Sequence, residues 1–570
     1  MNVGGTAGAV PAQGKPHSRK RPRDAPAHVI SVPLRPKPAV AAKVVTRLEA
    51  GRKVYNASLG EALCRCEAMH ADPGWEIAKK LPKGPPCSPA AMARKAAFTA
   101  LAERHGFTRT KLQSYGSSLR STWVRQHVGA QEAQLLAARA FDATDRWSRG
   151  LGGKPRFKSF RRGLRSAGTK DTCGDMAPVF DGQGAPAALR WAGLDFPFAP
   201  LPGGQRSRAH REGQAERERL RRALAEGGLL QARVVRTTIG GRPTLRAQFV
   251  VDGRAPVRHA VGGGKVSVDA GPSDIYVTAA DTQGQPVPAG CTSYPLAPGA
   301  VFNAAGLRRA QRHFDRQHRA GSPSCFDEKG RHREGGCDWA ARSKRAERTK
   351  AKISDGYRRL AERRSSEHGK LANGLLAVGT DVRYEDVNYV AWQKMFPRSA
   401  RDRAVGAFMA GLARKAENAG GSAYAYSTRT TALSQTCTCG VREKKPLSQR
   451  YHRCTCGVEA QRDMFSSFLG QYVTHVEALE DKGCDVLDLG EAKRMFPVFA
   501  PYLQEAGELS GKSGTAAKHR VRRRRPPGRR SLVRIRNRHK RRAHGATEVL
   551  GKNSEPTHAT VASTVIAEAA

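Results

Sequence analysis

The sequence predicts a multidomain α+β protein with disordered basic ends, and three observations support this fold class. The chain has 570 residues, about four times the ~150 residues of a typical domain. Lys and Arg number 99 against 50 Asp and Glu, and the net charge of +49 indicates a polyanionic partner, nucleic acid first of all. Helical and strand-like apolar segments alternate through the middle of the chain, while both ends are poor in apolar residues.

The first part of the chain divides into a basic arm, a strand and a helical region. Residues 1–27 are poor in apolar side chains and predict a disordered basic arm. Alternation from His28 to Leu34 predicts a strand, and we assign 28–50 to the first strand of a small β-barrel. Apolar side chains at helical spacing predict a helical domain over 51–150, with a Pro-rich break at 81–89.

Strand-like runs predict that the β-barrel or sheet continues over 151–265. Ala232 to Thr238 and Thr244 to Val251 are rich in β-branched residues, which favour strands. The exception is Arg206 to Ala225, whose many charges predict an exposed helix or loop.

From residue 266 the pattern predicts an α/β layer around a central sheet. Two short apolar runs with a Gly/Pro turn between them, Val266–Gly271 and Ile275–Ala280, predict a core hairpin. The following elements are a basic helical region over 305–370 with a loop at 322–336, strand character over 375–390, a helix over 403–420 and a strand over 422–427.

The chain ends in a basic tail. Lys518 to Arg542 holds 14 Lys and Arg in 25 residues without an acid, and we expect 511–570 to be disordered. The sequence has no stretch of about 18 apolar residues and no signal-peptide pattern, so we expect a cytoplasmic protein without a membrane partner.

Four of the 12 cysteines form two matching Cys-Thr-Cys-Gly knuckles over 436–458. Each glycine supplies a tight turn that lets the thiolates converge, so Cys437, Cys439, Cys454 and Cys456 predict a zinc ribbon that holds Zn²⁺. The usual spacing has two residues between the cysteines, and one residue here predicts a tighter geometry. His452 is an alternative ligand or a nucleic-acid contact. No role is assigned to Cys64, Cys66, Cys325 or Cys337.

Three acidic residues are candidates for a second metal site. Asp269 ends an apolar strand, Glu385 stands at the end of another, and Asp463 opens a helix after the second knuckle. Each alone is commonly a cap. Together they fit a nuclease that uses two divalent ions, because such a site needs carboxylates from separate segments. Asp386 follows Glu385 directly, so a strand places it on the opposite face.

At these residues the chain resembles the TnpB family of bacterial insertion sequences, RNA-guided nucleases ancestral to the compact type V CRISPR effectors. The resemblance covers roughly residues 265–475. Its motifs are Asp269-Ala-Gly-Pro-Ser, Arg308-Arg-Ala-Gln-Arg-His-Phe-Asp-Arg-Gln317, Ser366-Glu-His-Gly-Lys-Leu-Ala-Asn373, Thr430-Thr-Ala-Leu-Ser-Gln-Thr-Cys437, Lys444-Lys-Pro-Leu-Ser448 and Gln461-Arg-Asp463, with Gly51-Arg-Lys-Val-Tyr-Asn-Ala57 and Pro155-Arg-Phe-Lys158 more loosely.

The resemblance implies an RNase H-like (RuvC) α/β nuclease domain with an inserted zinc ribbon, beside a wedge β-barrel and a helical recognition domain. The domain would comprise 266–435, with the basic insert 305–370, and 459–510. Its catalytic residues would be Asp269, Glu385 and Asp463, which hold two Mg²⁺ or Mn²⁺ ions, with Asp269 bridging them. The partners implied are a guide RNA and double-stranded target DNA, the setting is bacterial and nucleoid-associated, and the oligomeric state stays open.

Basic and aromatic residues are the candidates for nucleic-acid contacts. Arg308, Arg309, Arg312 and Arg316 would line the helices of the insert, with few acids to offset them. Further basic residues of the insert are Arg342, Lys344, Arg345, Arg348, Lys350 and Lys352. Arg156 and Lys158 lie beside Phe157 and Phe160, which are suited to stack on bases, as are Tyr115 and Trp123. For Trp123, packing in a core is an equal alternative.

The leading hypothesis is an RNA-guided DNA endonuclease of transposon origin that recognises a short motif beside its target. The alternatives are an RNA-guided DNA-binding protein that represses without cutting, a type V CRISPR effector, a transposase and a general basic RNA-binding protein. The presence of all three acids argues against the RNA-guided protein that binds DNA without cutting it. A transposase is disfavoured because no catalytic Tyr beside a His pair is evident.

Overall fold

The computed structural model of the chain describes residues 25–85, 88–160, 163–169, 175–240, 242–328, 330–333, 342–446, 449–476 and 484–513. The chain divides into two compact units, residues 1–511 and 512–570, and nearly all of the second lies outside the described residues. The predicted tail beyond 513 and the basic arm up to residue 24 lie outside them too. None of the helices described has the length and apolar content needed to cross a membrane.

The N-terminal helices are centred on one long helix, α1 (Pro38–Ala71). It is followed by α2 (Pro73–Lys80), α3 (Pro89–Arg104), α4 (Arg109–Ser118), the short 3-10 turns η1 (Leu119–Ser121) and η2 (Trp123–Gln126), and α5 (Ala130–Ser148). The assignment of 28–50 to a strand region is wrong after Leu34. Pro38 suits the first helical turn because its φ is fixed there, and Val44 and Leu48 extend the buried face of α1.

Two antiparallel sheets make up the predicted barrel region. The first has the order β1-β7-β6-β2, and the second has the order β3-β4-β5. A bridge between Leu34 and Phe198 joins them. They share a core with α1 and α5, in which Trp191, Phe196 and Phe249 are fully buried. The bounds are β1 (Ala27–Leu34), β2 (Ser166–Gly168), β3 (Met176–Phe180), β4 (Pro186–Trp191), β5 (Leu194–Pro197), α6 (Arg208–Ala225), β6 (Leu229–Ile239) and β7 (Arg242–Asp252).

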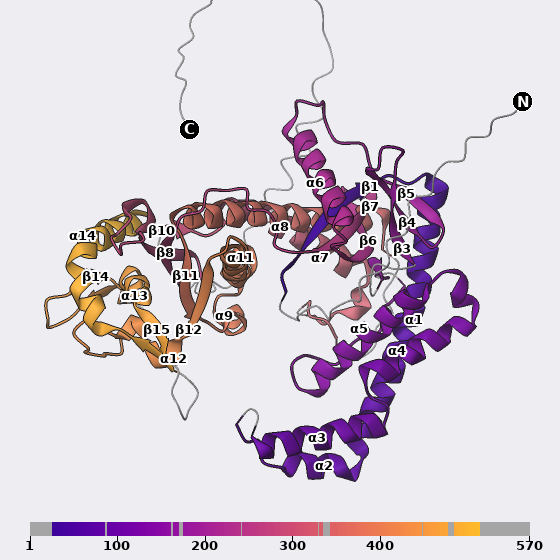
Figure 1. The fold of residues 1–570 in the computed structure, drawn as a ribbon, viewed down its shortest axis with the longest axis horizontal. Helices are drawn as coiled ribbons and strands as arrows, with labels where there is room; N and C mark the ends of the chain where they lie inside the picture. Colours follow the sequence, from indigo (N-terminus) through magenta and orange to yellow (C-terminus); the bar gives the residue numbers. More distant parts are fainter. Residues whose placement is uncertain are drawn as a thin grey trace, which may run out of the picture. The chain divides into compact units, whose positions relative to one another are not determined.

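A five-stranded sheet with the order β10-β9-β8-β11-β12 organises the second half of unit 1 (Figure 1). The strands are β8 (Gly264–Ala270), β9 (Asp274–Ala280), β10 (Thr292–Pro295), β11 (Gly379–Asp386) and β12 (Ser422–Ser427). β8 pairs antiparallel with β9, as the hairpin prediction requires, and parallel with β11, which pairs parallel with β12. The carboxyl ends of β8, β11 and β12 therefore meet at one edge of the sheet.

Helices cover both faces of this sheet. The last turn of α8 (Lys344–Val378) and the first turn of α11 (Val405–Asn418) bring Leu376 and Phe408 into the same core cluster as Val268 and Val382. On the other face lies α13 (Arg462–Gly470), where the Ser467 hydroxyl donates to the Ser267 carbonyl (2.8 Å). Smaller or peripheral elements are η3 (Pro288–Gly290), α7 (Pro298–Gly321), η4 (Pro323–Cys325), α9 (Tyr389–Met395), α10 (Pro397–Arg403), α12 (Thr428–Thr431), η5 (Leu433–Gln435), β13 (Tyr451–Arg453), β14 (Glu459–Gln461), β15 (Val473–Val476), β16 (Cys484–Leu487) and α14 (Leu489–Ser513).

Two local predictions need correction, although the mixed α/β class with several sheets is confirmed. Strand character was expected over 375–390, but α8 continues to Val378, β11 ends at Asp386 and α9 begins at Tyr389. Leu375 and Leu376 belong to the buried stripe of α8, and an apolar run of this length fits either structure. Cys325, to which no role was assigned, is buried and disulfide-bonded, while Cys337 lies outside the described residues.

Candidate metal centre and nucleic-acid surfaces

The sheet places Asp269 and Glu385 side by side. Val268 on β8 pairs with Tyr384 on the parallel strand β11, and the two acids are the next residue of each strand. Side chains alternate along a strand, so Asp269 shares the face of Ser267, over which α13 packs. Asp463 stands in the first turn of α13. The three predicted acids thus come together at the carboxyl ends of the parallel strands, where open α/β sheets commonly bind ligands.

The three carboxyl groups interact strongly with one another. Burial raises the pKa of Asp269 well above its ordinary value, and the charges of Glu385 and Asp463 raise it further. Burial and the charge of Asp463 also raise the pKa of Glu385 to about 7. The Ser466 hydroxyl donates a hydrogen bond to Asp269, which lowers the pKa of Asp269 and opposes the other two effects. Like charges this close are relieved by a divalent cation, and carboxylate oxygens are the ligands that Mg²⁺ and Mn²⁺ prefer.

Asp463 is held by residues of the segment that carries the cysteines. Arg462 Nε donates to its Oδ1 (3.0 Å), while Arg450 Nη1 and Gln461 Nε2 both donate to its Oδ2 (3.4 Å). Gln461 also caps α13, because its Oε1 accepts from the Met464 amide. Gln461 ends β14 and Arg450 precedes β13, so the β13–β14 hairpin positions this acid.

Asp386 does not join the cluster. It is exposed at the end of β11, and its charge acts on Tyr384 and Tyr389 rather than on Asp269 or Glu385. Each of Asp269, Glu385 and Asp463 keeps some accessible surface, so a ligand can reach them from the open edge.

The four predicted zinc ligands converge in the structure. Cys437 Sγ lies 3.5 Å from Cys456 Sγ, Cys439 Sγ lies 3.6 Å from Cys454 Sγ, and all four sulfurs are within 4.8 Å of one another. A tetrahedral Zn²⁺ with bonds of about 2.3 Å spaces its sulfurs at roughly 3.8 Å, so the group fits the ion. A single residue between the cysteines of each pair suffices for this convergence.

The two knuckles have the same backbone geometry. The Cys437 amide donates to the Val441 carbonyl (2.9 Å), and the Cys454 amide donates to the Val458 carbonyl (3.0 Å). Gly440 and Gly457 turn the chain with φ of +88° and +89°, a conformation that other residues rarely adopt. His452, the alternative ligand, is not part of the cluster: it is buried and stacks on Phe465 at 4.4 Å.

The predicted basic residues of α7 differ in their surroundings. Arg309, Arg312 and Arg316 are exposed and fall at helical spacing along one side of α7. Arg308 instead forms an ion pair with the buried Asp402 (3.0 Å), which ties α10 to α7. Of the basic residues at the start of α8, Lys344, Arg345, Arg348, Lys350 and Lys352 are exposed, while Arg342 pairs with Glu347 (3.2 Å).

The segment around Arg156 and Lys158 is fastened to α1. Arg52 and Asn56 both donate to the Lys158 carbonyl (2.8 and 3.0 Å), and the Lys158 amide donates to Asn56 Oδ1 (2.8 Å). Phe157 and Phe160 are 57% and 76% exposed, and Arg156 is exposed as well. Aromatic rings held outward beside cations suit stacking on bases.

Trp123 does not lie in a core. It is 49% exposed, and the Lys53 ammonium lies 4.8 Å from its ring centroid. Tyr115 is partly buried under Arg65, whose guanidinium is 6.0 Å from its ring.

Two residues beside the acids were missed in the sequence. Ser466 follows Asp463 by three positions on the same helix, so helical spacing was an available signal. Tyr389 lies near Asp269 and Glu385: burial raises its pKa, and the charges of these acids raise it further, but it comes after β11 has ended. No periodicity relates it to Glu385.

Comparison with known proteins gives only distant likenesses. No protein family profile and no curated protein matches the chain. Among solved structures, a cryo-EM structure described as the Cas12f1–sgRNA–target DNA complex aligns with a TM-score of 0.36 and 10% identity, covering 78% of this chain and 98% of that one. A cryo-EM structure described as a CRISPR–Cas12f ternary complex gives a TM-score of 0.25 and 10% identity, over 77% and 98%.

Proposed function

We propose that this chain is an RNA-guided DNA endonuclease of transposon origin, with Asp269, Glu385 and Asp463 as its metal-binding catalytic residues. The observation that carries the proposal is the convergence of three carboxyl groups, from β8, β11 and α13, at one accessible edge of a sheet. Three acids brought together at the cost of their mutual repulsion favour a cation site over a structural role.

The residues of the site would have different roles in phosphodiester hydrolysis. Mg²⁺ or Mn²⁺ held by these acids would supply an activated water and neutralise the charge that develops on the scissile phosphate. Asp269 interacts with both Glu385 and Asp463, so its carboxylate would hold the ions together with each of them. Arg450, Arg462 and Gln461 hold Asp463 in place.

The cysteine group serves the site indirectly. Zn²⁺ at Cys437, Cys439, Cys454 and Cys456 would fix the two knuckles, and the β13–β14 hairpin between them and α13 would then present Asp463 at a constant position.

The guide and the target would be held by backbone contacts. A paired RNA–DNA duplex presents a regular array of phosphates, and proteins recognise it by shape and charge. The exposed Arg309, Arg312 and Arg316 suit that role, and the helical and β-rich regions, with Arg156 and Lys158, would hold RNA and read a short motif beside the target.

The test replaces Asp269. In full-length protein purified with its co-expressed RNA, Asp269→Ala should lower target DNA cleavage by about a thousandfold or more, because both ions depend on this carboxylate. Nucleic-acid affinity should be unchanged or slightly higher, since a negative charge is removed. Asp386→Ala is the matched control and should cut at the wild-type rate.

The outcomes separate the alternatives. If folded, RNA-bound Asp269→Ala cuts as fast as the wild type, the assignment of the site is wrong. A wild type that binds a discrete RNA with a variable segment and its matching DNA, yet never cuts, is the repressor-like binder. The genomic neighbourhood, a transposon or a CRISPR array, decides between the transposon protein and the type V effector.

A further inference from the structure

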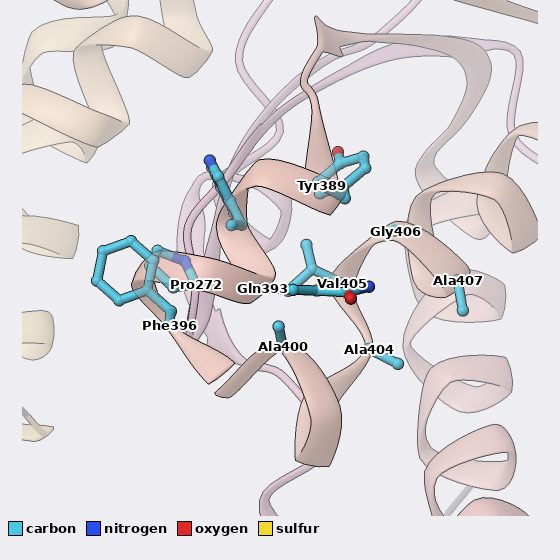
Figure 2. Close-up of a pocket in the computed structure, with 10 residues that line it drawn as sticks. Pro272, Tyr389, Gln393, Phe396, Ala400, Ala404, Val405, Gly406 and Ala407 are labelled. Carbon is cyan, nitrogen blue, oxygen red and sulfur yellow. The ribbon is translucent and has the colours of Figure 1, made fainter. Parts of the chain in front are cut away.

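A pocket of about 230 Å³ lies beyond the ends of the strands that carry Asp269 and Glu385. Its walls are α9, α10, the first residues of α11 and Pro272 in the β8–β9 turn. Figure 2 shows Tyr389, Phe396, Ala400 and Val405 around it, with the short helices α9 and α10 on one side and the start of α11 on the other.

Two residues that line the pocket follow the acids closely in the chain. Pro272 comes three residues after Asp269 at the end of β8, and Tyr389 comes four residues after Glu385 near the end of β11. Burial raises the pKa of Tyr389 above its ordinary value, and the nearby charges of Asp269 and Glu385 raise it further. A polymer bound at the acids therefore has this pocket within reach of its neighbouring groups.

Aromatic rings form the accessible wall. The Tyr389 and Trp392 rings lie 5.5 Å apart at 84°, and those of Trp392 and Phe396 lie 6.4 Å apart at 80°. Phe396 is 38% exposed, so part of this aromatic surface is uncovered. The Tyr389 hydroxyl is buried without a hydrogen-bond partner among the described residues. A buried donor without an acceptor is costly unless a ligand supplies one.

The walls are held in place by other contacts. Gly406 lets α11 approach Tyr389, because a Cβ there would lie 3.0 Å from the ring. The Ser399 hydroxyl donates to the Pro272 carbonyl, which fastens α10 to the β8–β9 turn. The Arg308–Asp402 ion pair fixes the other end of α10. The pocket is thus formed before a ligand arrives.

We propose that this pocket receives one nucleobase of the DNA strand being cut, the base beside the scissile phosphate, stacked against Trp392 and Phe396. This inference rests on the proposed function. A strand whose phosphate lies on the acids also carries sugars and further phosphates, but its bases are the groups with flat aromatic faces that match the rings of Trp392 and Phe396. The volume is below the ~300–1,000 Å³ of pockets for drug-sized ligands and suits a single planar group. Tyr389 and Gln393 supply the polar contacts.

The pocket would make cleavage selective for unpaired DNA. A base in a duplex is stacked and paired, so it enters such a site only after it has been turned out, which costs a few kcal/mol. The same base in a displaced single strand enters freely. Selectivity for single strands would then reside in Trp392 and Phe396 rather than in the acids.

The first experiment maps the contact without using cleavage. Full-length protein is mixed with single-stranded DNA containing 5-iodouracil, irradiated and analysed by mass spectrometry. We expect cross-links at Tyr389, Trp392 or Phe396 in the wild type, and also in Asp269→Ala, which keeps the pocket. DNA that binds and cross-links elsewhere but never at these three residues would overturn the inference.

The second experiment measures the contribution of stacking. A stacked base is worth about 1–3 kcal/mol, so Trp392→Ala should lower the cleavage rate of single-stranded DNA roughly 5- to 150-fold. Met395→Ala is the control, because Met395 lies on the same short helix, is exposed and does not line the pocket. If Trp392→Ala fails to fold, Phe396→Ala, which removes a more exposed ring, replaces it.

The two proposals fail in different ways. Cross-links in the pocket of a protein that never cuts DNA would support base binding and contradict the nuclease. Cleavage that depends on Asp269 but is equal in wild type, Trp392→Ala and Phe396→Ala would keep the nuclease and refute the pocket.

Discussion

At the scale of single residues, buried carboxyl groups occur in two different settings in this chain. Glu132 on α5 is 1% exposed, and burial raises its pKa to about 8. Its Oε2 accepts a hydrogen bond from Trp191 Nε1 (3.4 Å), and it lies beside the buried core that contains Trp191 and Leu136, with Arg47 and Asp175 near enough to act on its charge. Asp269 and Glu385 also have raised pKa values, but they stand at an accessible sheet edge. A raised pKa therefore marks burial, and only the convergence of acids at an edge indicates a cation site.

Glu132 predicts a defined pH dependence of stability. Its pKa is about 8 in the folded chain against an ordinary value of 4.5, so the folded state keeps a proton that the unfolded state has lost. The contribution of Glu132 to the free energy of unfolding is fully present below about pH 4.5 and is lost as the pH rises through about 8. Glu132→Gln stays neutral throughout. The variant should gain on the order of 3 kcal/mol over the wild type between pH 5 and pH 9.

Thermal melting of both proteins from about pH 5 to pH 9 checks this expectation. Equal differences in melting temperature at every pH would show that Glu132 titrates normally in the folded protein. Glu103→Gln, on the surface helix α3, is a suitable control.

The sequence singles out residues that conflict with their surroundings or recur in pairs. Asp269 lies in an apolar strand and the cysteines come in matched pairs; the structure brings Asp269 near Glu385 and Asp463, whose catalytic role stays a prediction, and gathers the four sulfurs. Tyr389 and Trp392 gave no such signal, because aromatic residues three apart look like an ordinary buried helix face. Arg308 was grouped with its basic neighbours, since the buried partner Asp402 is distant in sequence.

At the scale of elements, the approach of α13 to the sheet sets the position of Asp463. Gly470 at the end of this helix has no room for a side chain, because a Cβ would lie 2.4 Å from both Ser267 Oγ and Tyr426 Oη. Tyr426 is fully buried and has no space to withdraw.

Gly470→Ala should therefore destabilise the protein by about 1–3 kcal/mol and displace α13, with a loss of cleavage as Asp463 moves. Gly411→Ala on α11 is the matched control. Its Cβ would meet nothing within 4 Å, so the change should be neutral or stabilise by up to about 1 kcal/mol. Melting curves and cleavage rates of Gly470→Ala and Gly411→Ala test this expectation. Equal stability of the two variants would mean that α13 can shift without destabilising the protein.

The cysteine knuckles are the second feature at the scale of elements that affects the position of Asp463. Cys437→Ser should remove bound zinc and loosen the segment that leads to Asp463, so cleavage should fall together with zinc content. Cys64→Ser, an exposed cysteine outside the knuckles, should change neither. Atomic emission on purified protein measures the metal; a wild type without zinc would end this prediction.

Element boundaries were harder to predict than element types. The hairpin β8–β9 and the helix α11 follow directly from their patterns, and α6 forms where the charges predicted either an exposed helix or a loop. The start of α1 at Pro38 was missed although Arg35-Pro-Lys-Pro38 interrupts the strand pattern, and the end of α8 at Val378 was missed because apolar residues continue across that boundary. Packing against neighbours that are distant in sequence, such as β8 for Leu376, decides these limits.

At the scale of the whole chain, charge is distributed unevenly. The net charge is +49, and the segment from Lys518 to Arg542 alone carries 14 Lys and Arg without an acid. That segment lies outside the described residues and is not needed for any core identified within them.

Removal of residues 514–570 should leave the melting transition intact and reduce non-specific affinity for nucleic acid. Each lost phosphate contact lowers the slope of log affinity against log salt by roughly 0.7–0.9, so the slope should fall by several units. Filter binding across a salt series measures this. A truncated protein that aggregates, or that binds with an unchanged slope, would contradict the prediction.

The order of the acids along the chain has a consequence during synthesis. Asp269 leaves the ribosome first, Glu385 must then pair its strand β11 with the waiting β8, and Asp463 arrives only after the knuckles that precede α13. Until Asp463 has been synthesised, a growing chain holds at most two of the three acids in place. A chain terminated before this residue would therefore lack the third carboxyl group of the candidate site.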